Sequence, residues 1–488
     1  MGGAANRVLE TASQEKMDTH TLFSAAFDHF GAVSDTQALL HALAEQSSQG
    51  SYNPAQRVAF WRRRTSLAQR ALSRVVIDNW ERTRIALMAT SAPITGLTHS
   101  HQHDSRVVVI GGGYAGAAAA RALDSNFNVT LVARQQRLVH DAAGVRAGVV
   151  AGWETRVAIP LSGLLSRGNL LSGVEATKVD ENAKTVTLSN GEQLKYDYLI
   201  IAAGTLGPKT VGAAVTPTAA DGIDAVFKAR QAAIASAKRI LVIGGGATSI
   251  EQAAEIVAHH GKAKEVVLVT AEGLMEDPFI AFSDSLKAML HKMLAAQGVT
   301  IHLNAGFITL DREADENGFI VGTSTYRLSG DGKLSGEFDL AIPCLGTRKT
   351  PPFIAASGWL DKLDGVFIKV DTTLQVEGCP AGTVFAIGDI ANLKESKLAY
   401  FALQQAKLVA RNIEALATGQ ALEKYRVHTK PTLLLPLGPH HGAGQFNGWL
   451  MGDFASTAYK SKSLFVPKMW HLFGAKAELE KIVAANNC

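Results

Sequence analysis

Cysteine is scarce in this sequence, and its scarcity excludes two kinds of protein. Only Cys344, Cys379 and Cys488 occur among 488 residues, and they are far apart. Three isolated cysteines cannot build a disulfide framework. The alternating His99, His101 and His103 could bind a metal, but no cysteine or acidic cluster stands beside them at ligand spacing, which favours a solvated linker. We therefore expect neither a disulfide framework nor a metal site, and a reducing compartment fits this composition.

Long apolar runs and a large excess of one charge are also missing. No uninterrupted run approaches the roughly 18 residues of a membrane span, so we expect no transmembrane helix. The net charge of +4 is too small to indicate nucleic acid, although it permits attraction to an anionic membrane surface. A hydrophobic content of 47% in 488 residues predicts a globular protein of two or three domains.

A glycine-rich turn at residues 106–116, RVVVIGGGYAG, organises the first half of the chain. The β-branched run 107–110 predicts a buried parallel strand, and the alanines that follow predict a helix packed closely on it. The GxGxxG spacing allows a tight turn, brings a pyrophosphate close to the backbone and points the helix N-terminus at it. The residues expected to form this dinucleotide site are Gly111, Gly112, Gly113, Tyr114, Ala115 and Gly116.

A second copy follows in residues 238–256, KRILVIGGGATSIEQAAEI. Its strand is expected at 240–243, with Gly244 and Gly246 in the first two glycine positions. Ser249 replaces the third glycine, and serine is small enough for close packing. One such turn can occur in a sheet that binds nothing, but two copies in strand and helix context predict two dinucleotides.

Later apolar segments supply further strands. Residues 196–205 end in Ala203 and Gly204, where the chain is expected to pass under the first cofactor, and residues 338–347 close the second unit. Residues 383–391, TVFAIGDIA, deliver Gly388 and Asp389 at the carboxyl edge of a strand, where ligands bind in open α/β sheets. Asp389 is therefore placed to accept hydrogen bonds from cofactor hydroxyls, and the alternative is a helix N-cap.

One residue departs from the dinucleotide fingerprint. The second strand, expected at 129–132, should end in an acid that binds the ribose hydroxyls, but Ala133 and then Arg134 stand there. Either other groups hold this ribose, or the arginine meets a phosphate.

The two ends of the chain carry amphipathic segments. Residues 54–89 interleave arginines with apolar residues, which fits an anionic membrane surface, a cleaved targeting segment or a solvated face of a docked helix. The stretch after Tyr425 mixes aromatic residues with lysines and fits an interfacial surface near the acceptor, a cover over the cofactor or a dimer contact. Its members are Phe446, Trp449, Leu450, Phe454, Phe465, Trp470, Leu472, Phe473, Lys460, Lys462 and Lys468.

Taken in this order, the motifs over residues 106 to about 475 resemble the flavoprotein family of pyridine nucleotide:disulfide and quinone reductases. Within it they are most similar to the ferroptosis-suppressor and apoptosis-inducing-factor-like group of NAD(P)H:quinone oxidoreductases. The likeness rests on RLVHDAAGVRAGV, GGGATSIEQAAEI, ESKLAYFALQQA, LGPHHGAGQFNGWLMG and SKSLFV.

This resemblance implies FAD in the first glycine turn and NADH or NADPH in the second. It implies that Arg146 contacts FAD, that the main chain near Ala176 meets the adenine, and that Asp389 binds the ribitol. It places Glu251 and Glu255 at the nicotinamide side and Lys397 near the flavin and the acceptor. Without the resemblance, the two glutamates could equally form a solvated helix face and Lys397 a surface charge.

The implied activity is hydride transfer from NAD(P)H to flavin and electron transfer onward to a quinone. Residues 106–222 contain no cysteine, which excludes a thiol relay beside the flavin and favours a quinone or a diffusible carrier. Thr270 stands where an acid would select NADH, and Glu272 follows with no adjacent cation for a 2′-phosphate, so we favour NADH. The alternatives are a reductase of a soluble carrier such as ferredoxin and a flavoprotein scaffold.

We therefore predict an α/β protein with two Rossmann-like domains, a helical N-terminal extension and a C-terminal α+β domain. The expected divisions are 1–104 for the extension, 105–222 and 347–423 for the FAD domain, 223–346 for the NAD(P)H domain and 424–488 for the acceptor region. We expect no nucleic-acid partner, and a homodimer and a peripheral membrane surface are compatible with the sequence. The expected place is the cytoplasmic face of a membrane or a mitochondrion-associated site.

Overall fold

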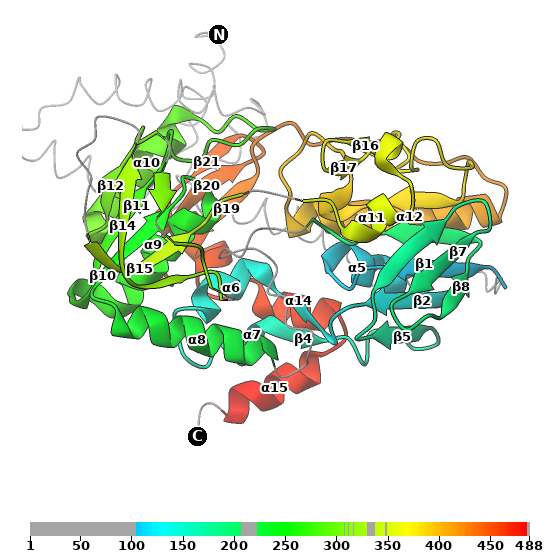
Figure 1. Cartoon of the computed structure of the whole chain (residues 1–488), viewed down its shortest axis with the longest axis horizontal. Helices are drawn as coiled ribbons and strands as arrows, with labels where there is room; N and C mark the ends of the chain where they lie inside the picture. Colours follow the sequence, from blue (N-terminus) through cyan, green and yellow to red (C-terminus); the bar gives the residue numbers. More distant parts are fainter. Residues whose placement is uncertain are drawn as a thin grey trace, which may run out of the picture. The chain divides into compact units, whose positions relative to one another are not determined.

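The computed structural model describes residues 104–205, 222–306, 308–310, 312–315, 317–328, 337–346 and 349–485. The predicted helical extension and its basic segment at 54–89 lie outside the described residues. The described residues form two units with a parallel sheet each and a C-terminal region (Figure 1).

The first sheet is parallel throughout, with the strand order β18-β9-β1-β2-β5. The strands expected at 107–110 and 129–132 are present within one residue of those bounds, because β-branched runs buried on both faces suit a parallel sheet. The strands are β1 (Arg106–Ile110), β2 (Asn128–Ala133), β5 (Asn169–Ser172), β9 (Tyr198–Ile201) and β18 (Val384–Ala386).

Helices α5 (Tyr114–Leu123) and α12 (Ala399–Ala417) pack against each other beside this sheet. Alanine occupies most buried positions of α5, which lets the helix approach the strands closely. The same unit carries the antiparallel sheet β6-β7-β8. The remaining elements of this part are β3 (Arg137–Val139), α6 (Asp141–Ala147), α7 (Glu154–Val157), β4 (Ala158–Pro160), β6 (Ala176–Asp180), β7 (Thr185–Leu188) and β8 (Gln193–Lys195).

The second sheet has the order β12-β11-β10-β15-β14-β13. Its first four strands are parallel, and β14 and β13 add an antiparallel edge. The strands are β10 (Arg239–Ile243), β11 (Glu265–Val269), β12 (Thr300–His302), β13 (Ile308–Leu310), β14 (Ile320–Leu328) and β15 (Glu337–Pro343). The helices are α8 (Gly222–Ser236), α9 (Ala247–His260), the 3₁₀ turn η1 (Gly261–Ala263) and α10 (Asp284–Gln297).

The chain then returns to the first sheet before it enters the C-terminal region. The return comprises α11 (Pro352–Ala356), η2 (Leu360–Lys362), β16 (Leu363–Asp364), β17 (Phe367–Ile368), β18, η3 (Gly388–Ile390) and α12. The C-terminal region comprises the antiparallel sheet β19 (Leu433–Pro436), β20 (Gly442–Phe446) and β21 (Trp449–Met451), then α13 (Asp453–Ser456), the π-helix η4 (Thr457–Ser461), α14 (Val466–Leu472) and α15 (Lys476–Ala485). Over the described part of the chain, every helix is too short or too polar to span a bilayer.

Candidate functional site

The first glycine turn has the form of a phosphate cradle. Gly111 has a φ of +114°, and a Cβ added there would collide with the carbonyl oxygen of Ala202. A Cβ added at Gly116 would collide with the Gly111 carbonyl oxygen, so the turn needs glycine at both positions. At Gly113, which precedes α5, a Cβ would meet nothing within 4 Å. The turn is therefore tight beneath and open at the helix N-terminus, which fits the pyrophosphate of FAD.

The second turn repeats this geometry. Gly244 has a φ of +128°, and a Cβ there would lie 2.7 Å from the carbonyl oxygen of Cys344. Gly246 precedes α9 and faces open space, as Gly113 does. Ser249 is fully buried, and its hydroxyl donates a hydrogen bond of 2.7 Å to the Gly246 carbonyl. The serine fits the third position because its small polar group bonds back to the turn.

The turn after β18 joins both halves of the first unit. Gly388 has a φ of +75°, and a Cβ there would lie 3.1 Å from the Cβ of Ala115. Its N–H donates to Gln405 Oε1 over 2.6 Å. Asp389 follows at the carboxyl edge, inside η3 rather than at its cap, which is Ile387. Asp389 therefore lies next to the point where the turn after β18 approaches the first helix, α5.

Glu395 is the hub that holds this turn in place. It is 1% exposed, and its carboxylate accepts hydrogen bonds from Gln405 Nε2 at 2.9 Å, Tyr425 Oη at 2.8 Å and His428 N at 2.9 Å. Because Gln405 in turn binds Gly388, the segment leading into the C-terminal region is coupled to the Asp389 turn. Sequence reasoning missed Glu395, since its partners are scattered along the chain.

Two further expected contacts lie at other points of the first unit. Ala203 and Gly204 lie two and three residues after the end of β9, and Gly204 has a φ of +62°. Ala176 begins β6 and is 8% exposed.

Arg146 and Glu255 form a buried ion pair between the two units. Arg146 on α6 is 3% exposed and Glu255 on α9 is 2% exposed. The Arg146 Nε donates to both carboxylate oxygens of Glu255 at 3.0 Å. The guanidinium also lies 4.9 Å from the ring centroid of Trp153. Figure 1 shows α6 between the two groups of strands. The Arg146–Glu255 ion pair connects α6 to α9.

Glu251 pairs with a lysine of the C-terminal region. Its Oε1 accepts a hydrogen bond of 3.1 Å from Lys460 Nζ, which also donates to the Leu434 carbonyl over 2.8 Å. Burial raises the pKa of Glu251, and the Lys460 ammonium opposes that shift. Both α9 glutamates are thus buried and paired, so the alternative of a solvated helix face is wrong.

Lys460 corrects the interpretation of the C-terminal lysines. The sequence pattern groups it with the interfacial residues, but it is 8% exposed and lies in the π-helix η4. Single π turns inside helical segments often occur at functional sites. No local signal in the sequence marks this lysine, because its partner Glu251 is 209 residues away.

Lys397 belongs to a separate group of contacts, in the loop after Asp389. Its Nζ donates to the carbonyls of Ala391 at 2.7 Å and Leu393 at 3.2 Å. The same ammonium lies 4.8 Å from the ring centroid of Phe367 and 5.8 Å from that of Phe279. Lys397 is half-buried and bonded to the main chain, rather than a simple surface charge.

His140, just before α6, ties the first turn to the C-terminal region. Tyr114 Oη and His140 Nδ1 are 2.7 Å apart, and His140 Nε2 donates to the Leu464 carbonyl over 2.6 Å. Burial lowers the pKa of His140 to about 4, so its ring is neutral and Nδ1 accepts from the tyrosine. Leu464 and Phe465 both have positive φ, at 50° and 61°, and the histidine holds this strained pair.

Asp141, the first residue of α6, lies in the field of Asp389. Its side chain reaches solvent, yet the surrounding protein and the Asp389 carboxylate raise its pKa to about 7, against the opposing effect of Arg230.

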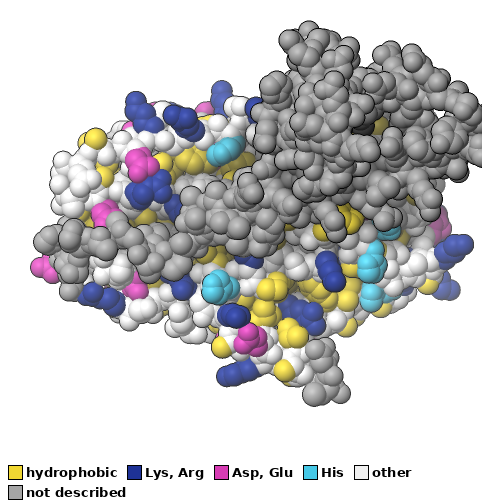
Figure 2. Space-filling model, turned by 180° about the vertical axis from the view of Figure 1, so that it is seen from behind, with side chains coloured by type: hydrophobic (Ala, Val, Ile, Leu, Met, Phe, Trp, Pro, Cys, Tyr) yellow, Lys and Arg dark blue, Asp and Glu magenta, His cyan; other side chains and the backbone are white. Residues whose placement is uncertain are grey.

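The C-terminal aromatics divide into two sets. Trp470 and Phe473 belong to the core, and Trp470 Nε1 donates to the Arg156 carbonyl over 2.7 Å, so the prediction that they are interfacial is wrong. Trp449, Leu450 and Phe454 are 54%, 41% and 64% exposed and form what we call the hairpin tip, on β21 and the start of α13. On the face drawn in Figure 2, hydrophobic side chains gather in patches beside Lys and Arg side chains.

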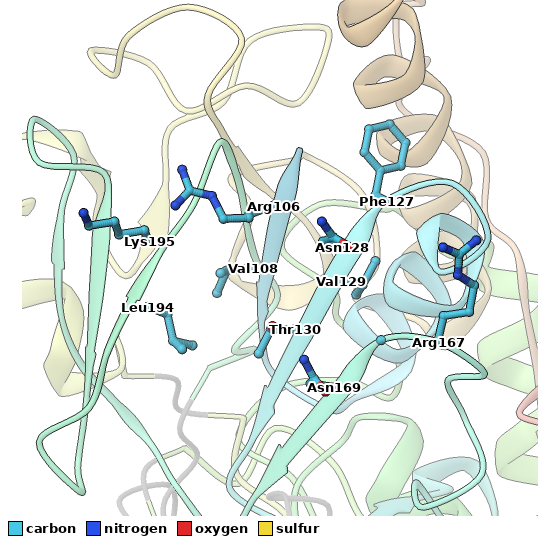
Figure 3. Close-up of a pocket in the computed structure, with 11 residues that line it drawn as sticks. Arg106, Val108, Phe127, Asn128, Val129, Thr130, Arg167, Asn169, Leu194 and Lys195 are labelled. Atoms are coloured by element: carbon cyan, nitrogen blue, oxygen red, sulfur yellow. The ribbon is translucent and has the colours of Figure 1, made fainter. Parts of the chain in front are cut away.

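A cavity of about 350 Å³ lies at the opposite edge of the first sheet (Figure 3). Its lining includes Arg106, Asn128 and Asn169, the first residues of β1, β2 and β5, so it lies at the amino edge of the parallel strands. The Arg106 guanidinium donates two hydrogen bonds to Asp197, from Nη2 to Oδ1 at 2.9 Å and from Nε to Oδ2 at 3.0 Å. This cavity is therefore distinct from the glycine turns. Among the described residues, no three His, Cys, Asp or Glu side chains gather as metal ligands would.

Known proteins share this sequence and fold. Residues 105–406 match the pyridine nucleotide-disulphide oxidoreductase family. Ferroptosis suppressor protein 1 of Taeniopygia guttata is 32% identical over 76% of this chain and 96% of its own length. Apoptosis-inducing factor homolog B of Dictyostelium discoideum is 30% identical over 74% of this chain and 95% of its own.

Solved structures share the fold at low identity. The sulfide:quinone oxidoreductase of Aquifex aeolicus superposes with a TM-score of 0.60 at 17% identity, covering 76% of this chain and 92% of that protein. NDH2 of Plasmodium falciparum, solved in complex with NADH, superposes with a TM-score of 0.57 at 14% identity, covering 78% of this chain and 98% of that protein.

Acid should destabilise the fold through His140. The pKa of His140 is about 4 in the folded chain and 6.5 when unperturbed, so the unfolded chain takes up a proton at a higher pH than the folded chain does. The stability that neutral His140 contributes is therefore fully present above pH 6.5 and is lost as the pH falls toward 4. We expect the unfolding free energy of the wild type, minus that of His140→Gln, to fall by about 3 kcal/mol over this range. Urea titrations across the pH range measure this difference, in which the shared titration of Asp141 cancels. A difference that stays constant with pH would refute the assignment.

Proposed function

This chain belongs to the pyridine nucleotide-disulphide oxidoreductase family and is an FAD-dependent oxidoreductase of NAD(P)H, and on that premise we propose that its electron acceptor is a quinone. The observation that carries the proposal is the buried Glu251–Lys460 pair, which links the second nucleotide-binding unit to the C-terminal region. Relatives named ferroptosis suppressor protein 1 and the fold of a sulfide:quinone oxidoreductase support the same acceptor class.

Thiol chemistry does not fit Cys344 and Cys379, the two cysteines that the structure describes. No cysteine occurs in residues 106–222, so a redox disulfide in that part is excluded. Burial raises the pKa of Cys344 to about 12 and, together with the Glu181 carboxylate, raises the pKa of Cys379 as well. Both thiols are therefore protonated and weakly nucleophilic at neutral pH. We therefore expect the acceptor to take its electrons directly at the cofactor.

The residues of the glycine turns would hold the two nucleotides. The chemistry that FAD supplies when bound is to accept a hydride from NAD(P)H and to pass two electrons on to the acceptor. Gly111, Gly113 and Gly116 would hold its pyrophosphate, and Asp389 its ribitol. Gly244 and Gly246 would hold the pyrophosphate of NAD(P)H. Arg146 would contact FAD, and its ion pair with Glu255 would fix the orientation of its guanidinium.

Lys460 is our candidate for the proton donor. A quinone that takes two electrons also takes two protons, one of which originates in the hydride. Lys460 Nζ would supply the other proton or its positive charge to the acceptor oxygen, while Glu251 Oε1 keeps the buried ammonium oriented. Lys397 remains a second candidate for charge stabilisation, because its ammonium lies in the loop that follows Asp389.

We favour NADH as the donor. Thr270, directly after β11, is 4% exposed, and its hydroxyl donates to the Gly273 carbonyl over 3.3 Å. The only charged groups in residues 270–277 are carboxylates, and a 2′-phosphate would be repelled there.

The hairpin tip is our candidate for a membrane contact. Trp449 and Leu450 lie on β21, which pairs with β20 in an antiparallel hairpin, and Phe454 follows four residues after Leu450. All three side chains are exposed, and tryptophan favours the membrane interface. Such a contact would let a lipid-dissolved quinone reach the C-terminal side of the cofactor site.

Loss of the Lys460 ammonium should slow turnover with little effect on FAD content. In Lys460→Met, Glu251 is left as a buried acid without its cation, which raises its pKa further. We expect kcat for NADH oxidation by a short-chain ubiquinone to fall about 100-fold, within the range for loss of a general acid. Glu251→Gln should cause a similar loss. Steady-state assays with flavin content measured in parallel test this.

The matched control is Lys462→Met, which removes an exposed lysine two residues away. It should keep wild-type turnover. If Lys460→Met binds FAD normally and turns over quinone at the wild-type rate, Lys460 has no part in the reaction.

Removal of the apolar hairpin tip should weaken membrane binding. The double variant Trp449→Ser and Phe454→Ser should bind vesicles of phosphatidylcholine and phosphatidylserine about tenfold more weakly, because two aromatic side chains no longer enter the interface. Co-sedimentation of the full chain measures the affinity. The control Val321→Ser, at a side chain that is 52% exposed on β14, should bind as the wild type does. Equal binding by the double variant would exclude the hairpin tip as the membrane face.

A further inference from the structure

The place where this fold family usually carries an acid is filled by apolar atoms here. Ala133 ends β2 and is 1% exposed. A Cβ added at Gly112 would lie 2.9 Å from the Cβ of Ala133 and 2.9 Å from Cδ1 of Leu161. The Ala133 methyl group and the Leu161 side chain therefore occupy the space beside the first glycine turn, and neither can accept a hydrogen bond from a ribose.

A carboxylate reaches the same edge of the sheet from the neighbouring strand. β2 and β5 are parallel, with Ala133 opposite Ser172, and Gly173 N donates to the Ala133 carbonyl over 2.9 Å. Two residues beyond Gly173 stands Glu175. Glu175 lies close to the end of β2, because Arg134, which directly follows Ala133, is 3.8 Å from its carboxylate. The carboxyl ends of the strands form the edge at which ligands bind in open α/β sheets.

The main chain of Glu175 is fixed by hydrogen bonds, and a cation lies near its side chain. Arg134 Nε lies 3.8 Å from Glu175 Oε1. The main chain of Glu175 is held by Ser189, whose hydroxyl accepts from Glu175 N over 3.1 Å and whose N–H donates to the Glu175 carbonyl over 2.8 Å. The Glu175 side chain is 53% exposed and that of Arg134 is 30% exposed. The main chain of Glu175 is therefore anchored by Ser189, while its carboxylate oxygens are accessible to a ligand.

We propose that Glu175, oriented by Arg134, binds the adenosine ribose hydroxyls of FAD in place of an acid at the end of β2. A carboxylate accepts hydrogen bonds from neighbouring hydroxyls, and those to a charged acceptor are the stronger kind. Glu175 also directly precedes Ala176, whose main chain is our candidate for the adenine contact. Arg134 serves the carboxylate rather than a phosphate, since FAD carries no 2′-phosphate and the arginine's charge is balanced by Glu175.

Binding of flavins to the apoprotein tests this proposal without any turnover. Glu175→Gln should bind FAD about tenfold more weakly than the wild type, measured by quenching of flavin fluorescence. The control is Glu192→Gln, which removes an exposed carboxylate from the nearby turn between β7 and β8 and should leave the affinity unchanged. Equal FAD affinities for Glu175→Gln and the wild type would overturn the proposal.

Ligands that differ in the ribose show whether the effect is local. AMP and 2′-deoxy-AMP are compared as displacers of FAD. The wild type should prefer AMP, and Glu175→Gln should lose most of that preference. A variant that binds FAD weakly yet discriminates between the two nucleotides as the wild type does would assign Glu175 a general structural role and refute the ribose contact.

Discussion

Four buried charges join the three parts of the described chain. Arg146 belongs to the first nucleotide-binding unit, Glu251 and Glu255 to the second, and Lys460 to the C-terminal region. Each is at least nine-tenths buried. Removing one member of such a pair typically costs about 3 to 5 kcal/mol, because the opposite charge is left buried without a partner. The docking of α6, α9 and η4 therefore depends on all four charges being present together.

This arrangement also links structure to chemistry. The glutamates lie on α9, whose N-terminus forms the second glycine turn, so nucleotide binding and the buried charges share one helix. At the N-terminal end of α6, His140 forms a hydrogen bond with Tyr114. Tyr114 is the first residue of α5, the helix that follows the first glycine turn. The two glycine turns are thus held in one orientation relative to each other and to the C-terminal region, as transfer between two bound nucleotides would require.

Local patterns in the sequence predict both glycine turns and the apolar strands of the two parallel sheets beside them, because burial on two faces and turn conformation are properties of short segments. The spacing of Glu251 and Glu255 also places them on one face of α9. The roles of Lys460 and Glu395 cannot be predicted in this way, since each acts through residues far away in the sequence. The sequence pattern assigns Trp470 and Phe473 to the surface because an aromatic residue beside a lysine has the same local pattern in a core and at an interface.

The most direct measurement is the absorption spectrum of the purified protein under anaerobic conditions. Our account predicts flavin bands that bleach when NADH is added and return when a short-chain ubiquinone follows. It also predicts that no added thiol or disulfide is needed for the second step. Flavin that NADH does not reduce, or reduced flavin that the quinone leaves unchanged while a soluble carrier protein reoxidises it, would contradict the assignment of a quinone as the acceptor.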